Sequence, residues 1–139
     1  MNADVRVEVG TELPTARYEL SRDDLRAYAE ASGDRNPIHL DEATARSVGL
    51  PDVIAHGMLT MGLAGTVVAD WVGDPARVLS FGTKFTAPVV VPADAPAVVE
   101  VSGTVVARDE AAGTAEVDLV VTSAGAKVLT RARAVVALP

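Results

Sequence analysis

The sequence contains no cysteine, and only 4% of its 139 residues are aromatic. The absence of cysteine excludes a disulfide framework, a thiolate metal site and a cysteine nucleophile. Acidic residues outnumber basic ones, which gives a formal net charge of −7. Non-specific binding of nucleic acid needs a basic surface and aromatic stacking platforms, so we expect no nucleic-acid partner. An anionic ligand would have to meet a local group of basic residues.

The chain also has little that indicates a membrane or export. Its first eight residues, MNADVRVE, carry charges where a secretory leader requires an apolar stretch. No residue between Gly57 and Ala69 is charged, but these 13 residues (57 to 69 inclusive) fall short of the roughly 20 that a bilayer span needs. We therefore expect a cytoplasmic protein without a membrane segment. The length predicts a single domain over residues 1–139.

The first half of the sequence has helical signals. Ser21 with Asp24 three residues later is typical of a capping box, and Gly33 is placed to end the helix that this box begins. Asp41 is placed to cap a short second helix. Between Gly57 and Ala69 apolar residues occur on every side of a helix, which predicts a central helix, at about residues 57–72, that is buried all round.

The second half changes to the period of two that is typical of strands. Between residues 115 and 122, apolar and polar side chains mostly alternate, which predicts a sheet with one dry and one wet face. Gly10 and Pro14 interrupt the N-terminal lead-in, so the first strand is expected only after them. The expected strands are 17–20, 78–87, 97–107, 115–122 and 127–138.

These elements predict an α+β fold in which a curled antiparallel sheet of about five strands wraps around the central apolar helix, at about residues 57–72. A single sheet wrapped around a single helix leaves its outer strands with open edges. Pairing of those edges across a two-fold axis would protect them, which favours a dimer.

Chemistry-bearing residues gather between the first two helices. Asp34 and His39 stand five positions apart, on chain that Gly33 and Pro37 keep out of regular helix. The only other histidine, His56, follows at no regular metal-ligand spacing, so we expect no metal. A neutral imidazole can take a proton from water while a carboxylate orients that water and relays a proton. Each residue also has a plainer interpretation, as a turn-forming aspartate and a structural histidine.

Such a pair suits the addition of water to, or its removal from, a carbon–carbon double bond next to a carbonyl. Charge then develops on the carbonyl oxygen, which needs preorganised donors. The N–H groups at the start of the helix near Gly57 are donors of this kind, and the missing side chain lets an oxygen approach. We interpret His56 as a supporting residue that bonds backbone near the start of this helix.

The residues of these two segments carry a family resemblance. The strings SGDRNPIH at 32–39 and AHGML at 55–59 resemble the hydratase motif of MaoC-like hot-dog proteins, the (R)-specific enoyl-thioester hydratases and 3-hydroxyacyl-thioester dehydratases. The similarity continues through 48–50, 54–62 and 71–75. Over nearly the full chain it is strongest to the HadB-type catalytic subunit of mycobacterial-type (3R)-hydroxyacyl-carrier-protein dehydratases.

The resemblance implies reversible interconversion of a trans-2-enoyl thioester and an (R)-3-hydroxyacyl thioester in fatty-acid-type metabolism, without a cofactor. It implies that Asp34 and His39 hold the catalytic water, that the Gly57 N–H meets the thioester carbonyl, and that Asn36 supports the loop. The substrate would be carried by CoA or by an acyl carrier protein. The assembly would be a homodimer, or a heterodimer with a second hot-dog subunit. Arg35 stands where relatives often have an apolar residue.

Two other functions fit parts of the pattern. A hot-dog thioesterase would share the fold, but the long helix lacks a carboxylate in its first turns. A non-catalytic acyl-binding subunit of a heterodimeric dehydratase would have no need of both Asp34 and His39.

The last strand carries one more candidate. Its wet face presents Lys127, Arg131 and Arg133 at period-two spacing, where they could bind an anionic thioester arm. A solvated strand face explains the same residues equally well.

Overall fold

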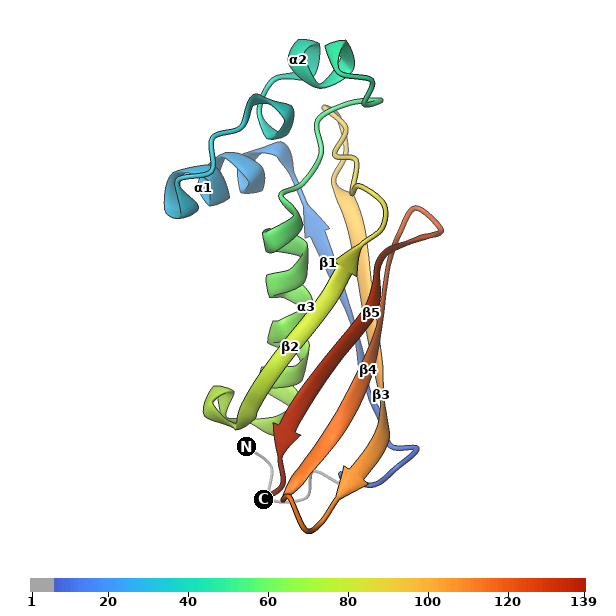
Figure 1. Ribbon diagram of the computed structural model, residues 1–139. Helices are drawn as coiled ribbons and strands as arrows, with labels where there is room; N and C mark the ends of the chain where they lie inside the picture. The colour runs from blue at the N-terminus through green and yellow to red at the C-terminus, as the bar shows by residue number, and fades with distance from the viewer. Residues whose placement is uncertain (1–6) are drawn as a thin grey trace.

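The computed structural model describes residues 7–139. Five strands form one antiparallel sheet in the order β1-β3-β4-β5-β2. The sheet curls around the long helix α3, and α1 and α2 lie beyond the N-terminal end of that helix (Figure 1). The expected α+β layout is therefore confirmed. The strands are β1 (Glu12–Leu20), β2 (Val78–Phe85), β3 (Ala97–Asp109), β4 (Thr114–Ser123) and β5 (Ala126–Ala137).

The helices begin and end where local signals place them. The capping box of α1 is present, because the Ser21 hydroxyl accepts from the Asp24 N–H at 3.2 Å and the Asp24 carboxylate accepts from the Ser21 N–H at 2.8 Å. Gly33 ends α1 with φ of 80°, a left-handed conformation that glycine adopts without strain. The helices are α1 (Arg22–Ser32), α2 (Glu42–Ser47) and α3 (Gly57–Val72), with 3₁₀ turns at Pro37–His39 and Pro75–Arg77.

Two local expectations are wrong in detail. Asp41 is the N-cap residue of α2, but its carboxylate accepts from the Thr44 hydroxyl at 2.6 Å and makes no cap bond to a backbone N–H within the described chain. β1 begins at Glu12 instead of residue 17, and it contains Pro14. Proline removes one ladder donor, which is tolerated here because β1 is an edge strand whose register shifts next to the proline.

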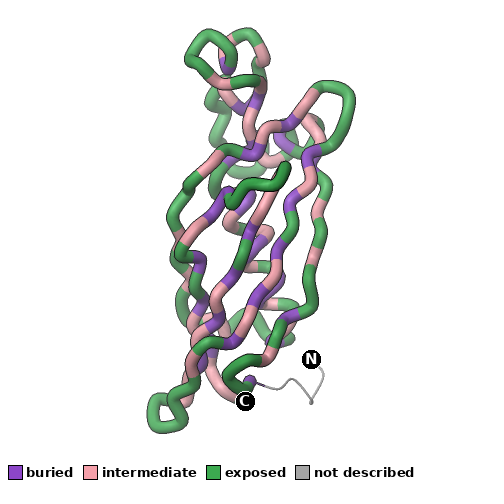
Figure 2. Tube along the Cα trace, turned by 90° about the vertical axis from the view of Figure 1, so that its right-hand side faces the viewer, coloured by how far each residue is buried: buried purple, intermediate pink, exposed green. Residues whose placement is uncertain are grey.

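The core lies between the dry face of the sheet and α3. Along β4 the side chains of Ala115, Val117, Leu119 and Val121 are buried, as the alternation predicts. Buried positions mostly alternate with half-buried and exposed ones along β3, β4 and β5 (Figure 2). Valines dominate this core because a β-branched side chain packs well on a pleated surface.

Helix α3 is not buried all round in the single chain, contrary to the expectation. Its buried residues all come from one side of the helix, and Met58 in its first turn is 59% exposed. The sheet wraps only part of the helix, so an apolar face stays uncovered. Among the helices of residues 7–139, none combines the length and the apolar character that a bilayer crossing requires. The buried residues of α3 are Thr60, Ala64, Val67, Val68 and Val72.

β5 departs from regular pairing near its start. Its register with β4 shifts on both sides of Val121, and Arg131 has φ of 50°, which is rare for a residue with a side chain. The Val128 carbonyl accepts instead from the Thr86 N–H at 2.9 Å. The irregular part of β5 therefore holds the segment that follows β2.

The side chains around Gly103 leave little room for a larger residue. The cross-strand partners of Gly103 are Leu13 on β1 and Leu119 on β4, and a Cβ at this position would lie 2.7 Å from Cδ2 of Leu119. We expect Gly103→Ala to lower the free energy of unfolding by about 1–3 kcal/mol through overpacking, measured by chemical denaturation. Glu100→Ala, an exposed position on the same strand, is the control and should change it by less than about 0.5 kcal/mol. Equal stability of the two variants would show that the leucines move aside.

Candidate active site

The loop between α1 and the first 3₁₀ turn is shaped by its own polar side chains. The Ser32 hydroxyl accepts from the Asp34 N–H at 3.1 Å, and the Asp34 carboxylate accepts from the Asn36 N–H at 3.2 Å. The Asn36 side chain in turn accepts from the Ile38 N–H at 3.3 Å, which caps the turn that Pro37 begins. Asn36 thus bonds within the loop through both its N–H and its side chain, and its supporting role stays a prediction.

His39 is 8% exposed and is bonded to backbone through one ring nitrogen. Its Nδ1 lies 2.7 Å from the Ile54 carbonyl oxygen. A carbonyl oxygen only accepts, so Nδ1 must carry the proton, and the neutral ring presents its lone pair at Nε2. The Ile54 N–H donates back to the Ile38 carbonyl at 3.2 Å. His39 is thus held as a base whose accepting atom is Nε2.

The surroundings of His39 favour its neutral form. Burial lowers the pKa of the His39 imidazole below its ordinary value, and the neighbouring His56 lowers this pKa further. The bond to Ile54 and the charge of Asp34 act in the opposite direction without reversing the shift. A neutral imidazole near pH 7 is the form that can take a proton from water.

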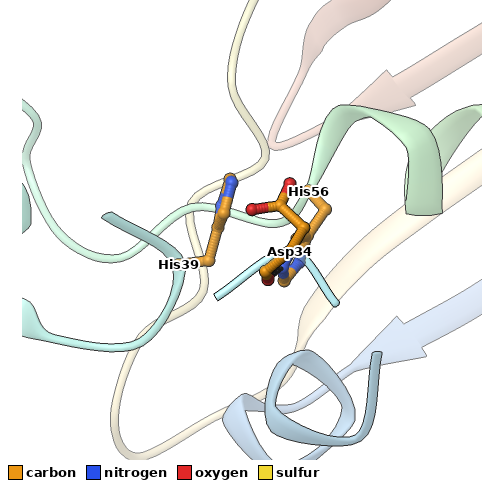
Figure 3. Close-up of side chains that lie close together, drawn as sticks. All are labelled: Asp34, His39 and His56. Atoms are coloured by element: carbon orange, nitrogen blue, oxygen red, sulfur yellow. Dashed lines mark hydrogen bonds between the residues drawn. The ribbon is translucent and has the colours of Figure 1, made fainter. Parts of the chain in front are cut away.

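His56 joins the two candidate catalytic residues. It is 1% exposed, and its Nε2 lies 2.9 Å from the backbone carbonyl oxygen of Asp34. Its ring stacks on that of His39, with centroids 3.9 Å apart and planes at 23°. Figure 3 shows the three side chains grouped together, with the Asp34 carboxylate turned toward the His39 ring. The predicted support by His56 goes to the loop that carries Asp34.

The group also resembles a metal site in composition. One potential ligand atom from each of Asp34, His39 and His56 lies within 4.8 Å of the others. A shared ion needs the in-plane lone pairs of both rings to converge, whereas nearly parallel stacked rings keep them in separate planes. One nitrogen of each ring already bonds a carbonyl. The arrangement therefore suits a held water better than a metal ion.

The N-terminus of α3 offers unpaired donors beside this group. His56 is the N-cap residue, and no side chain of the described residues caps the helix. The Leu59 and Thr60 N–H groups both donate to the His56 carbonyl, whereas those of Gly57 and Met58 precede the first intrahelical acceptor. A Cβ at Gly57 would lie 3.0 Å from Cε1 of Phe85, so this position fits glycine. N–H groups at a helix start are donors of the kind that stabilise an oxyanion, and this role for Gly57 stays a prediction.

A cavity of about 360 Å³ brings His39 and Gly57 onto one wall. Asp34 and His56 do not line the cavity, but both lie close to His39, with Asp34 exposed and His56 buried. The remaining lining is mostly apolar and comes from three segments. These are Leu50, Ile54 and Ala55 before α3, residues 85–89 at and after the end of β2, and residues 128–129 in the irregular part of β5, to which α3 itself adds Thr60.

The predicted basic residues lie elsewhere. Lys127, Arg131 and Arg133 come together around a separate hollow on the exposed face of β5. Arg133 is paired there with Asp118, with Nε and Oδ1 2.6 Å apart. Binding of a thioester arm by these residues stays a prediction, and it would have to occur away from the cavity that holds His39.

Arg35, the unusual residue of the motif, points away from the group. Its guanidinium makes two bonds of 3.1 Å to the Glu30 carboxylate at the surface. This pairing accounts for an arginine in the loop without any contact to the cavity.

Three neighbours of the site are not predicted by the sequence. The Tyr28 ring meets His56 edge-on at 4.7 Å, the Ile54 carbonyl holds His39, and Phe85 stands over Gly57. Tyr28 was recognisable only as part of an amphipathic helix face, and a backbone carbonyl leaves no signal in the sequence.

Comparison with known proteins identifies the family. The family model of the MaoC like domain matches residues 4–123. The chain belongs to the MaoC-like family. Among curated proteins, the 3-hydroxyacyl-thioester dehydratase X of Mycobacterium tuberculosis is 37% identical over 82 residues, which are 59% of this chain but only 28% of that protein.

Two solved structures extend the comparison to the whole fold. A structure described as a MaoC-like dehydratase has a TM-score of 0.93 and 42% identity, covering 95% of this chain and 41% of that one. The (R)-hydratase from A. caviae involved in PHA biosynthesis has a TM-score of 0.83 and 28% identity, covering 95% of this chain and 97% of that one. The expected hot-dog fold is thereby confirmed.

The His39 environment makes a prediction that needs no substrate. Because burial lowers its pKa, we expect the His39 ring to titrate below the ordinary imidazole value of about 6.5 in an NMR titration. The unfolded chain then binds a proton more readily than the folded one, so the free energy of unfolding should fall as the pH drops through about 6.5.

The control for this prediction is His39→Gln, which should reduce the loss of stability between neutral and mildly acidic pH. A His39 pKa at or above the ordinary value would contradict the burial argument.

Proposed function

We propose that this protein catalyses the reversible hydration of trans-2-enoyl thioesters to (R)-3-hydroxyacyl thioesters. The observation that carries the proposal is the fixed tautomer of His39. Its Nδ1 is bonded to the Ile54 carbonyl at 2.7 Å, which leaves Nε2 as the basic atom. One ring nitrogen of His39 lies within 4.8 Å of an Asp34 carboxylate oxygen, and His39 lines the same cavity as Gly57. The (R)-hydratase named above, which matches over nearly its full length, supports both the reaction and its stereochemistry.

In the hydration direction, Asp34 and His39 hold one water molecule between them. His39 Nε2 accepts a proton from the water as the water oxygen bonds to C3 of the enoyl chain. The electron pair of the C2–C3 double bond moves toward the thioester carbon, and negative charge develops on the carbonyl oxygen. The proton held by His39 then passes to C2, with the Asp34 carboxylate as relay, so the net addition is hydroxyl to C3 and hydrogen to C2.

The start of α3 stabilises the enolate in this scheme. The Gly57 N–H donates to the thioester oxygen, and the positive end of the helix dipole lies behind it. No acidic residue stands in the first turn of α3 to oppose that charge or to serve a thioesterase reaction. The acyl chain lies along the apolar wall formed by residues 85–89 and 128–129. CoA and acyl-carrier-protein thioesters both fit this scheme, because only the acyl end enters the cavity.

A second hot-dog subunit completes the enzyme. Met58 on α3 is 59% exposed, and Leu79 and Phe85 on β2 are each 56% exposed, which is unusual for large apolar side chains. β2 is also an edge strand with open backbone groups. A partner that covers this surface also closes the cavity near Phe85, so assembly and activity are expected together.

The catalytic pair is tested by Asp34→Asn and His39→Ala. Each variant should lower the hydration rate of a four-carbon trans-2-enoyl-CoA by roughly 10²- to 10⁴-fold, because proton transfer loses its acceptor or its relay. The loss of enoyl absorbance in the ultraviolet measures the rate, and the solution mass is recorded in the same preparation.

Arg35→Ala is the matched control from the same loop, and it should keep the wild-type rate because Arg35 contacts Glu30 at the surface. Wild-type rates in both catalytic variants would end the proposal. An inactive wild-type chain that gains activity only with a second hot-dog subunit, and loses it again in Asp34→Asn, would assign the active site to this chain of a heterodimer.

The start of α3 is tested by Gly57→Ala. The added methyl group would meet the Phe85 ring at 3.0 Å and crowd the donor N–H. We expect kcat/KM to fall by about 10- to 100-fold, since a displacement of about 1 Å at a reacting group is enough for such a loss. Combining the change with Phe85→Leu should restore part of the rate by making room, whereas an unchanged rate in Gly57→Ala would remove this N–H from the mechanism.

A further inference from the structure

His56 is a buried titratable residue that the reaction scheme does not use. It is 1% exposed and does not line the cavity, so it does not meet the substrate. It is the N-cap residue of α3, yet its side chain makes no cap bond to the described residues of the helix. Its polar atoms must therefore serve something other than the helix end.

One nitrogen of His56 has a partner and the other has none. Nε2 lies 2.9 Å from the Asp34 carbonyl oxygen, which only accepts, so Nε2 carries the proton. Nδ1 is buried and finds no hydrogen-bond partner among residues 7–139. An unpaired buried nitrogen is a cost that proteins usually avoid, and it is tolerated here while the Nε2 bond and the ring contacts fix the side chain.

The ring contacts of His56 reach the other catalytic residue. Its ring stacks on His39 at 3.9 Å, and Tyr28 meets it edge-on at 4.7 Å. Tyr28 lies on α1, whose last turn leads directly to Asp34. One imidazole thus contacts the helix before the loop, the loop backbone at Asp34 and the ring of His39.

We propose that His56 is a positioning residue that sets the Asp34 backbone through its Nε2–H bond and the His39 ring plane through stacking. The inference rests on the proposed hydratase function. His39 has one hydrogen-bonded anchor of its own, the Nδ1 bond to Ile54, and turning of its ring is opposed by that bond alone. The stacked His56 ring adds a second restraint on the ring plane, so His39 Nε2 and the Asp34 carboxylate meet the same water.

Three variants separate the two contacts of His56. His56→Gln keeps an N–H that can reach the Asp34 carbonyl but loses the stack, and His56→Phe keeps the stack but loses the bond. His56→Ala loses both. We expect kcat of His56→Ala to fall by about 100-fold with KM within about threefold, and each of the other two variants to recover part of the loss.

The matched control is Val72→Ala, a fully buried change at the far end of α3. It should lower the melting temperature without lowering kcat. If His56→Ala keeps kcat within about threefold of the wild type, or raises only KM, His56 merely shapes the start of the helix and the inference is overturned.

The role of His56 can also be measured without substrate, so that its test is independent of the test of the proposed reaction. Nitrogen NMR of labelled histidines should show His39 protonated at Nδ1 and His56 at Nε2, two opposite tautomers in contact. In His56→Ala the His39 signals should indicate a mixture of tautomers, whereas His56→Phe, which keeps the stack, should leave His39 protonated at Nδ1. Unchanged His39 signals in His56→Ala would refute the positioning by stacking. A wild-type protein that has the expected signals but is inactive both alone and with a second hot-dog subunit would refute only the reaction.

Discussion

The bond from His39 Nδ1 to the Ile54 carbonyl is the constraint on which the site depends. Together with the return bond from the Ile54 N–H to the Ile38 carbonyl, it joins the loop after α1 to the segment that leads into α3. Without this bond, neither ring nitrogen of His39 would be fixed as the protonated one. The base and the oxyanion donors would then lie on two segments that this bond does not join. With it, a proton acceptor and a helix N-terminus face one cavity at a fixed separation.

The apolar scaffold gives this constraint its chemical effect. His39 is 8% exposed, and this burial lowers the pKa of its imidazole and favours the neutral form. The cavity that His39 lines is mostly apolar, and its walls include Val89, Val128 and Leu129 of the buried core. Fold and site are connected at this point, since residues of the core that stabilises the sheet also line the cavity.

Much of this architecture is readable from the sequence because its signals are local. The capping box at Ser21, the glycine at 33 and the alternation along β4 each act within a few residues, and the motif places Asp34 and His39 on one loop. Long-range pairing is not readable in this way. The start of β1 before Pro14 depends on β3, and the exposed face of α3 depends on how far the sheet wraps. The contacts of His56 required the folded chain, because they join three segments.

The uncovered face of α3 and the mouth of the cavity belong to one surface. Phe85 lines the cavity, stands over Gly57 and is 56% exposed, while Met58 projects from the same helix turn. A partner subunit that buries these side chains must therefore also shape the entrance of the cavity that His39 lines. The irregular pairing of β5 has a related effect, because the Val128 carbonyl holds the segment at Thr86 and thereby fixes another part of the cavity wall. In the proposed reaction, specificity for the acyl chain would thus depend on the interface and on the β5 irregularity, whereas the hydration chemistry would depend on the loop.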